Sequence, residues 1–328
     1  MNDLISVVIP AYNASSRIKA TLESVIAQDY PNIEIIVVND SSTDNTGELA
    51  SSVLESSGRK FKLINHTTNK GECASRNTGI ENATGEYISF IDADDLIEPS
   101  FISSLYAAIL KDDCEISYCG LVDRFTNGRP DDLKNHSDEL RVKPPITGET
   151  VILDDAMPAV VCCLYSTNFI GKYNLKFYEG CTTGGDINFV MKAMCQAKKV
   201  TFIEQCLYIY IHHSEMGSVR DNNTPNKKFL RYEHNTQAQL DTAEYILQHA
   251  SSKALKKYAE NILKPQSIIR KFKLYAMKND KAGYDLLLRK NDISNAFSFY
   301  TLSHKPEIFL KALAIKIIPW LYFRLRRR

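Results

Sequence analysis

The chain has 328 residues, of which 44% are hydrophobic, and this length fits one large domain or a catalytic domain with an extension. So apolar a composition excludes a chain that is disordered throughout. The 40 basic and 39 acidic residues give a net charge of +1, so no global charge points to nucleic acid as a partner.

The N-terminal segment and the cysteines indicate the compartment. Residues 1–15, MNDLISVVIPAYNAS, lack a basic region before a short apolar stretch that runs into a proline, so we interpret them as a first strand rather than a signal peptide. The eight cysteines include one adjacent pair, Cys162 and Cys163, and no CxxC spacing, which argues against a zinc ribbon or a disulfide framework. We expect reduced, mostly buried thiols in a cytoplasmic protein.

The first hundred residues alternate between two periodicities. Apolar, β-branched runs predict strands at residues 4–12, 33–40, 61–65 and 86–92. Helical spacing and capping residues predict helices at residues 16–28, 41–58 and 71–83. Continuous apolar strands that alternate with helices indicate an α/β fold, a mostly parallel sheet with helices on both faces.

Acidic side chains follow two of these strands. Asp40 ends the second strand, and Asp92, Asp94 and Asp95 follow the fourth. Ligands of open parallel sheets bind at the carboxyl ends of the strands, so we expect these side chains to face one crevice.

Neither a dinucleotide fingerprint nor a P-loop is present to bind phosphates. A D-x-D pair can instead offer oxygen ligands to Mg²⁺ or Mn²⁺, whose charge offsets that of a leaving nucleoside diphosphate. A solvated acidic turn is the alternative.

Five motifs occur in an order that resembles the family 2 inverting glycosyltransferases of GT-A (Rossmann-like) fold. They are ISVVIPAYN, QDYPNIEIIVVNDSSTDNT, NKGECASRNTGI, ATGEYISFIDADD and GGDINF, within a resemblance that covers residues 4–220. The resemblance implies a nucleotide-sugar donor, usually a UDP-sugar, a divalent cation (Mn²⁺ or Mg²⁺), and direct displacement with inversion at the anomeric carbon.

The resemblance also implies roles by position. Asp94 is the expected metal ligand, joined by Asp92, which binds ribose or metal, and by His213. Asp40, in an Asn-Asp pair where the family usually has Asp-Asp, is expected to accept a hydrogen bond from the base. The other candidates for binding the nucleotide sugar are Pro10, Ala11, Tyr12, Lys70, Gly71, Arg76, Ala93, Ser218 and Arg220.

Three of these assignments have structural alternatives. Asp40 is also placed to cap the next helix. Arg76 is also placed as a surface arginine that pairs with Glu72 one helical turn earlier. Tyr12 is also suited to core packing alone.

Inverting transfer needs a base that removes the proton of the acceptor hydroxyl. The resemblance assigns this role to Asp186, with Glu179 in reserve, and capping of the following helix is the alternative. Gly185 stands where the family usually has a glutamate, which puts the donor preference implied by the family in doubt.

The remaining sequence predicts loops and helices. Residues 121–150 are rich in Pro, Gly, Asn and charge, so we expect loops over the acceptor side. Residues 221–228 read as a linker, and residues 229–289 have helical spacing. We therefore expect a catalytic domain over residues 1–220 and a helical region over residues 221–328.

The last segment, EIFLKALAIKIIPWLYFRLRRR, mixes apolar and aromatic residues with a basic end. Lysines and a proline interrupt it, so an interfacial amphipathic helix on an anionic membrane surface fits better than a transmembrane span. The alternative is a helix docked on the protein's own core.

Together these features predict a metal-dependent inverting glycosyltransferase that acts on a glycan or lipid-linked glycan in cell-surface polysaccharide synthesis. We expect it to be cytoplasmic and peripheral on the inner face of the cell membrane. An inactive membrane-associated scaffold that binds nucleotide sugars and a nucleotidyltransferase of related fold are the alternatives.

Overall fold

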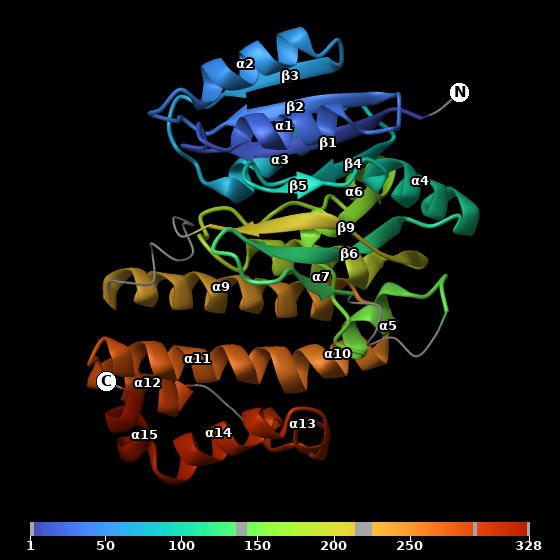
Figure 1. The fold of residues 1–328 in the computed structure, drawn as a ribbon. Helices are drawn as coiled ribbons and strands as arrows, with labels where there is room; N and C mark the ends of the chain where they lie inside the picture. The colour runs from blue at the N-terminus through green and yellow to red at the C-terminus, as the bar shows by residue number, and fades with distance from the viewer. Residues whose placement is uncertain (1–2, 136–142, 214–224, 291–293, 327–328) are drawn as a thin grey trace. The chain divides into compact units, whose positions relative to one another are not determined.

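The structure is a computed structural model that describes residues 3–135, 143–213, 225–290 and 294–326 (Figure 1). The chain divides into two compact units, residues 1–180 with 185–216 and residues 181–184 with 217–328. We call the first the α/β unit and the second the helical unit.

The predicted alternation of strands and helices is confirmed over the first hundred residues of the α/β unit. Its elements are β1 (Ile5–Ala11), α1 (Ile18–Ile26), β2 (Ile33–Asn39), α2 (Thr46–Ser56), β3 (Lys60–Asn65), α3 (Glu72–Asn82), β4 (Tyr87–Phe90) and β5 (Leu96–Ile97). Every residue of β1 is buried, so both faces of the sheet are covered at this strand.

Further strands and helices complete the α/β unit. They are α4 (Phe101–Asp112), β6 (Ile116–Phe125), β7 (Asp132–Lys134), α5 (Gly148–Leu153), the 3₁₀-helix η2 (Val160–Cys162), β8 (Cys163–Ser166), α6 (Thr167–Lys172), α7 (Gly185–Gln196) and β9 (Val200–His212). The eight cysteines all lie within the described residues as thiols without a disulfide, and six of them are buried.

The nine strands among the described residues form one sheet in the order β3-β2-β1-β4-β8-β6-β9-β5, with β7 paired to β6. Strand β1 runs parallel to β2 and β4, with Ala11 opposite Asn39 and Val8 opposite Phe90. The chain therefore leaves β1, β2 and β4 at the same edge of the sheet, which brings the residues after these strands together.

Aromatic packing fixes the start of α7 beside β4. The rings of Phe177 and Phe189 are stacked with centroids 4.1 Å apart, and Phe90 of β4 lies 5.8 Å from Phe189 in an edge-on contact. Asp186 precedes Phe189 by less than one helical turn, so this packing holds its main chain near the ends of the central strands.

The prediction of loops over residues 121–150 is wrong in its first part. Strand β6 continues to Phe125, and β7 pairs with it antiparallel. Asp123 in this strand is buried because Lys134 and His212 compensate its charge, the latter with Nε2 2.8 Å from its carboxylate. These partners are distant in sequence, so the strand looked like a polar loop.

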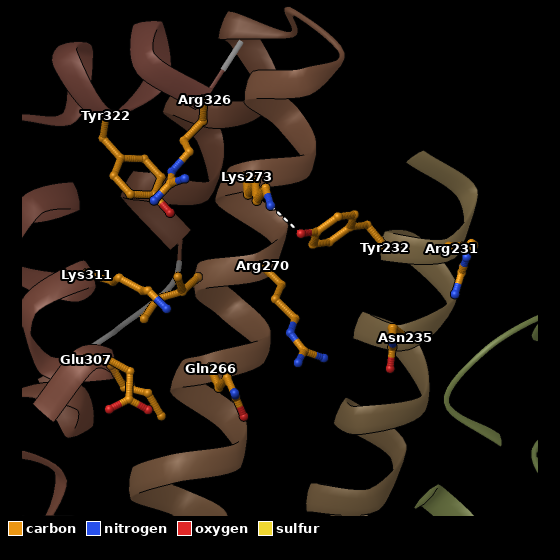
Figure 2. Close-up of a pocket in the computed structure, with 12 residues that line it drawn as sticks. Arg231, Tyr232, Asn235, Gln266, Arg270, Lys273, Glu307, Lys311, Tyr322 and Arg326 are labelled. Carbon is orange, nitrogen blue, oxygen red and sulfur yellow. Dashed lines mark hydrogen bonds between the residues drawn. The ribbon is translucent and has the colours of Figure 1, made fainter. Parts of the chain in front are cut away.

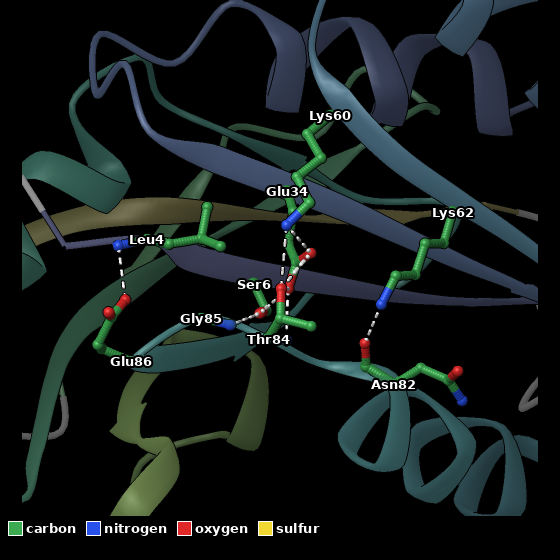
Figure 3. A network of polar contacts seen from close by, with 9 residues as sticks. All are labelled: Leu4, Ser6, Glu34, Lys60, Lys62, Asn82, Thr84, Gly85 and Glu86. Carbon is green, nitrogen blue, oxygen red and sulfur yellow. Dashed lines mark hydrogen bonds and ion pairs between the residues drawn. The ribbon is translucent and has the colours of Figure 1, made fainter.

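A buried carboxylate joins β1, β2 and the turn before β4 (Figure 3). Glu34 accepts hydrogen bonds from Ser6 Oγ at 2.6 Å and from Thr84 N at 2.6 Å, and Lys60 Nζ lies 3.1 Å away. Burial opposes the charged form, but these donors together lower the pKa of Glu34 to about 2.

Replacing Glu34 with glutamine is expected to remove a pH-dependent part of the stability. The pKa falls from 4.5 in the unfolded chain to about 2 in the fold, so this contribution is complete above pH 4.5 and is lost as the pH falls towards 2. It amounts to about 3 kcal/mol. Urea unfolding between pH 7 and pH 2 measures it, with Glu86→Gln as the exposed control in the same network. Identical pH dependence in Glu34→Gln and wild type would contradict this account.

The helical unit confirms the predicted helical region. Its elements are α9 (Pro225–His249), α10 (Lys253–Tyr258), the π-helix η4 (Ala259–Leu263), α11 (Lys264–Met277), α12 (Lys281–Lys290), the 3₁₀-helix η5 (Ser294–Phe297), α13 (Phe299–His304), α14 (Pro306–Ile317) and α15 (Pro319–Arg326). The linker prediction is wrong at residues 225–228, where α9 has already begun, because Pro225 suits the first turn of a helix. Residues 221–224 lie outside the described residues.

The C-terminal segment docks on the core of the helical unit with one face, as the alternative proposed. Its buried residues in that core are Ile308, Ala312, Ile315, Tyr322 and Phe323. Helices α14 and α15, with the residue between them, also expose large apolar side chains, namely Leu310, Ile317, Ile318, Trp320 and Leu325. Within the described residues, no helix has the length and apolar character that crossing a membrane requires.

Candidate active site

The carboxylates after β4 have different surroundings. Asp95 is buried, where it accepts hydrogen bonds from the Tyr208 hydroxyl at 2.7 Å and from the main-chain N–H of Ile211 at 2.9 Å. Burial, reinforced by the charge of Asp92, raises the pKa of Asp95 to about 8. Asp95 therefore ties the acidic turn to β9 and leaves Asp92 and Asp94 for the site.

Arg76, on α3, is fully buried among three carboxylates. Its guanidinium lies 2.5 Å from Glu72 Oε1 and 2.6 Å from Asp92 Oδ1, and it also donates a hydrogen bond to Asp186 Oδ1. The pair with Glu72 thus exists, but the alternative of a surface arginine is wrong. Arg76 brings together α3, the turn after β4 and the start of α7, and we call these four residues the Arg76 cluster.

The Arg76 cluster contains three carboxyl groups and one guanidinium. Burial opposes ionisation of Arg76, but its three acidic neighbours keep its pKa well above the usual value. Arg76 lowers the pKa of Glu72, but the neighbouring aspartates raise it to about 8, although the Glu72 side chain is 53% exposed. Burial also raises the pKa of Asp92. Such an excess of carboxylates favours the approach of a further cation.

Asp186 faces a pocket of the α/β unit with a volume of about 550 Å³. Glu72, Asp92, Asp123 and Lys134 contribute polar groups to its lining, and the residues 157–161 of the segment before β8, with Ile187 and Val190, contribute apolar ones. The Asp186 side chain is 52% exposed. It accepts a hydrogen bond from Arg76, so the alternative of a helix cap alone does not describe its contacts. Its Oδ2 atom has no hydrogen bond within the described part of the chain.

The reserve base, Glu179, has another role in the structure. It accepts a hydrogen bond from Asn77 Nδ2 at 2.8 Å, and Asn77 also donates to the carbonyl oxygen of Phe177 at 3.0 Å. Glu179 is not among the residues that line the pocket beside Asp186. Gly185 is the buried first residue of α7 and supplies no carboxylate there.

Asp40 lies at the end of β2 and is only 2% exposed. It accepts hydrogen bonds from the main-chain N–H groups of Lys70 at 2.9 Å and Gly71 at 2.7 Å, and His66 Nδ1 lies 2.7 Å from Oδ1. The alternative of a cap for the next helix is therefore wrong, because Asp40 holds the entry to α3 instead of α2. A hydrogen bond from the base of the nucleotide would come in addition to these three contacts of Asp40.

The other donor-site candidates follow β1 and β4. Pro10 and Ala11 are buried in β1, and Ala93 is buried in the acidic turn. Tyr12, directly after β1, is 52% exposed, so the alternative of core packing is wrong and its ring is accessible for stacking. Ser218 and Arg220 lie outside the described residues.

The donor groups of Asp94 and His213 suit a divalent cation whose other ligands are water and substrate oxygens. His213 Nε2 lies 3.4 Å from the main-chain oxygen of Asp94, which places the imidazole beside the acidic turn. No group of three or more His, Cys, Asp or Glu side chains within the described ranges forms a complete metal site. Mg²⁺ and Mn²⁺ commonly keep water and substrate oxygens as ligands, so two protein ligands are compatible with such an ion.

Residues 6–173 match the model of glycosyl transferase family 2. The chain belongs to this family. This glycosyltransferase is 31% identical to an uncharacterised glycosyltransferase of Escherichia coli K12, YibD, over 70% of the present chain and 67% of the relative. It is 36% identical to the E. coli UDP-Glc:α-D-GlcNAc-diphosphoundecaprenol β-1,3-glucosyltransferase WfgD over 35% of the present chain and 44% of the relative.

A solved structure supports the predicted fold of this family 2 glycosyltransferase. S. aureus TarS, residues 1–349, in complex with UDP-GlcNAc superposes with a TM-score of 0.69, 20% identity, and coverage of 99% of the present chain and 88% of TarS. The α/β architecture and the GT-A fold are thereby confirmed.

Sequence reasoning missed two residues around the site, His66 and Arg17. His66 follows β3 at the same sheet edge where Asp40 follows β2, so the strand-end rule that selected Asp40 also indicates His66. Arg17 carries no such signal, yet its Nε atom lies 4.0 Å from Asp94 Oδ2. It adds a cation to the side of the site where the acidic turn is exposed.

Proposed function

We propose that this enzyme is a metal-dependent inverting glycosyltransferase that moves a sugar from a nucleotide-sugar donor, a UDP-sugar, to a hydroxyl of a glycan or lipid-linked glycan. The observation that carries the proposal is the Arg76 cluster. It places a pocket-facing carboxylate, Asp186, beside the acidic turn at the carboxyl ends of the central strands. Those strand ends are where ligands of open α/β sheets bind.

In the proposed mechanism Asp186 acts as the general base. Its Oδ1 atom accepts a hydrogen bond from Arg76. Its Oδ2 atom takes the proton of the acceptor hydroxyl as the hydroxyl oxygen attacks the anomeric carbon. Arg76 fixes the direction of the carboxylate, because its own position is fixed by Glu72 and Asp92. The apolar wall of the pocket limits competing water.

Asp94 and His213 would hold the cation, and Tyr12 and Asp40 would border the nucleoside. When bound, the cation supplies charge that stabilises the leaving diphosphate. Arg17 would add to this charge from α1's N-terminal side. Ser218 and Arg220 remain candidates for phosphate contacts by sequence.

The names of the relatives support the donor and acceptor classes. TarS was crystallised with UDP-GlcNAc, and WfgD is named as a transferase that uses UDP-Glc and a diphosphoundecaprenol-linked sugar. We therefore place this enzyme in cell-surface polysaccharide synthesis, in the cytoplasm at the inner face of the membrane. The exposed apolar residues of α14 and α15 and their arginines would provide contact with an anionic membrane surface.

Replacing Asp94 with alanine is expected to lower sugar transfer at saturating donor by about a hundredfold or more, because the metal supplies several kcal/mol of charge stabilisation. It should also weaken Mn²⁺ binding in the presence of UDP, which electron paramagnetic resonance measures without turnover. Asp29→Ala, at an exposed turn, is the control. Unchanged Mn²⁺ affinity in Asp94→Ala would remove Asp94 from the metal site.

Two other functions remain to be separated by experiment. An inactive scaffold is favoured by Gly185, which lacks the usual carboxylate, and any sugar transfer excludes it. A nucleotidyltransferase would release pyrophosphate instead of a nucleoside diphosphate. A panel of nucleotide sugars assayed for both products, with and without a lipid-linked acceptor, distinguishes all three.

A further inference from the structure

The helical unit contains a cavity of about 590 Å³ between four of its helices (Figure 2). Helices α9, α11, α14 and α15 contribute its lining. The lining residues are Arg231, Tyr232, Asn235, Gln266, Ile269, Arg270, Lys273, Glu307, Ile308, Lys311, Tyr322 and Arg326. None of them belongs to the α/β unit, so this cavity is separate from the Asp186 pocket.

The cavity has five cationic side chains in its lining and one carboxylate, Glu307. Among the described residues, no acidic side chain lies within 4.0 Å of the charged groups of Arg270, Lys311 or Arg326. Lys278 shows the usual arrangement in the same unit, because it pairs with Glu233. A partly enclosed cluster of like charges is unfavourable alone and attracts an anion.

Arg270 and Lys273 lie almost one helical turn apart on α11, and both line the cavity. Burial lowers the pKa of Arg270, as expected for a guanidinium that has lost water. Lys273 Nζ donates to the Tyr232 hydroxyl oxygen and lies 3.9 Å from the centre of its ring. Figure 2 shows this contact across the cavity.

Neutral donors accompany the cations. Gln266 Oε1 accepts the amide of Gln239 at 2.5 Å, which leaves the NH₂ group of Gln266 as a donor at the cavity. Guanidinium, ammonium and amide donors converging from several helices suit the oxygens of a phosphate group.

The outer surface of the same helices indicates the source of the phosphate. Helices α14 and α15, which supply Lys311 and Arg326, also expose Leu310, Trp320 and Leu325, with Trp320 60% exposed. An apolar surface beside a cationic cavity matches an amphiphile with a phosphate head and an acyl or isoprenoid tail.

We propose that this cavity, centred on Arg270 and Lys273, is a binding site for a phosphate ester, and that its occupant is the headgroup of an anionic lipid. The proposal deepens the membrane association proposed above by naming a ligand and its residues. It does not depend on sugar transfer, so vesicle binding tests it even if the enzyme is inactive in the assay.

The test uses the full chain in flotation with vesicles of phosphatidylcholine, alone or mixed with phosphatidylglycerol, and calorimetry with inorganic pyrophosphate. The variant Arg270→Gln with Lys273→Gln is compared with Lys253→Gln with Lys257→Gln, which removes the same charge from α10 outside the cavity. Circular dichroism and thermal unfolding verify that both fold.

The cavity variant is expected to bind phosphatidylglycerol vesicles about 25-fold more weakly, since each of the two lost cations weakens binding about fivefold. The α10 variant should differ from wild type by less than about threefold, because screening weakens charges away from the contact. Pyrophosphate should compete with the vesicles.

One outcome is that the cavity variant loses pyrophosphate binding while both variants bind vesicles equally. This result would retain the phosphate site and assign it to a soluble ligand. Equal behaviour of the two variants towards both vesicles and pyrophosphate would overturn the proposal.

Discussion

Replacing Asp186 with asparagine is expected to lower kcat about 100- to 10,000-fold, the range that a general base contributes. Asparagine has nearly the same shape and keeps an oxygen for the hydrogen bond from Arg76, but it cannot take the acceptor proton at neutral pH. Donor binding should change little, because the proposed contact of Asp186 is with the acceptor hydroxyl and not with the nucleotide. Steady-state transfer kinetics and calorimetry with UDP measure the two quantities.

Glu179→Gln is the matched control for the base. Glu179 precedes α7 but is held by Asn77 and does not line the pocket, so its replacement should lower kcat by less than about tenfold. A larger loss of kcat in Glu179→Gln than in Asp186→Asn would transfer the role of base to Glu179.

Replacing Arg76 with glutamine is expected to reduce both stability and activity. It leaves Glu72, Asp92 and Asp186 without their shared hydrogen-bond donor, and because two of these side chains are about half exposed we expect a loss of about 1–3 kcal/mol. Transfer should fall as well, because Asp186 loses the group that orients it. Urea unfolding and transfer kinetics on the folded fraction separate these effects.

The pH dependence of Arg76→Gln gives a sharper test. The pKa of Glu72 is already raised to about 8 and that of Asp92 is raised, and loss of Arg76 raises both further. Between the unfolded pKa near 4.5 and these folded values, the folded state binds more protons, so stability decreases as the pH rises. The variant should therefore recover stability from pH 8 to pH 5 more than wild type does.

Arg59→Gln is the control for loss of a structural arginine. Arg59 donates to four main-chain carbonyl oxygens, two from each terminal nitrogen, at 2.7–3.0 Å, and none of the described carboxylates pairs with it. Its loss should lower stability without the recovery at low pH. If both variants show the same pH dependence, Glu72 and Asp92 in the Arg76 cluster do not have the raised pKa values that we infer.

The first half of the fold follows from the sequence because local rules decide it. Continuous apolar runs form β1, β2 and β4, and parallel pairing then places the residues after them at one edge. The same rule predicts that Asp40 and the acidic turn both follow strands at this edge. Strand β6 was missed because Asp123 makes it look polar, while the partners that neutralise that charge are far away in sequence.

The arrangement of the site depends on tertiary contacts that no local pattern contains. Arg76 and Asp186 are separated by 110 positions, and only the packing of α3 and α7 reveals their hydrogen bond. Asp95 looks equivalent to Asp94 in the sequence, yet the hydroxyl of Tyr208 assigns it a structural role. Motifs thus select candidate residues, and burial distinguishes those that hold the fold from those that face the substrate.

The anomeric configuration of the first-formed product tests the central claim most directly. Proton NMR of the reaction of wild-type enzyme with an α-linked UDP-sugar and a lipid-linked or glycan acceptor resolves the coupling of the new anomeric proton. Attack by an acceptor activated by Asp186, from the face opposite the diphosphate, predicts a β-linked product. An α-linked product would mean retention and would contradict the proposed single displacement.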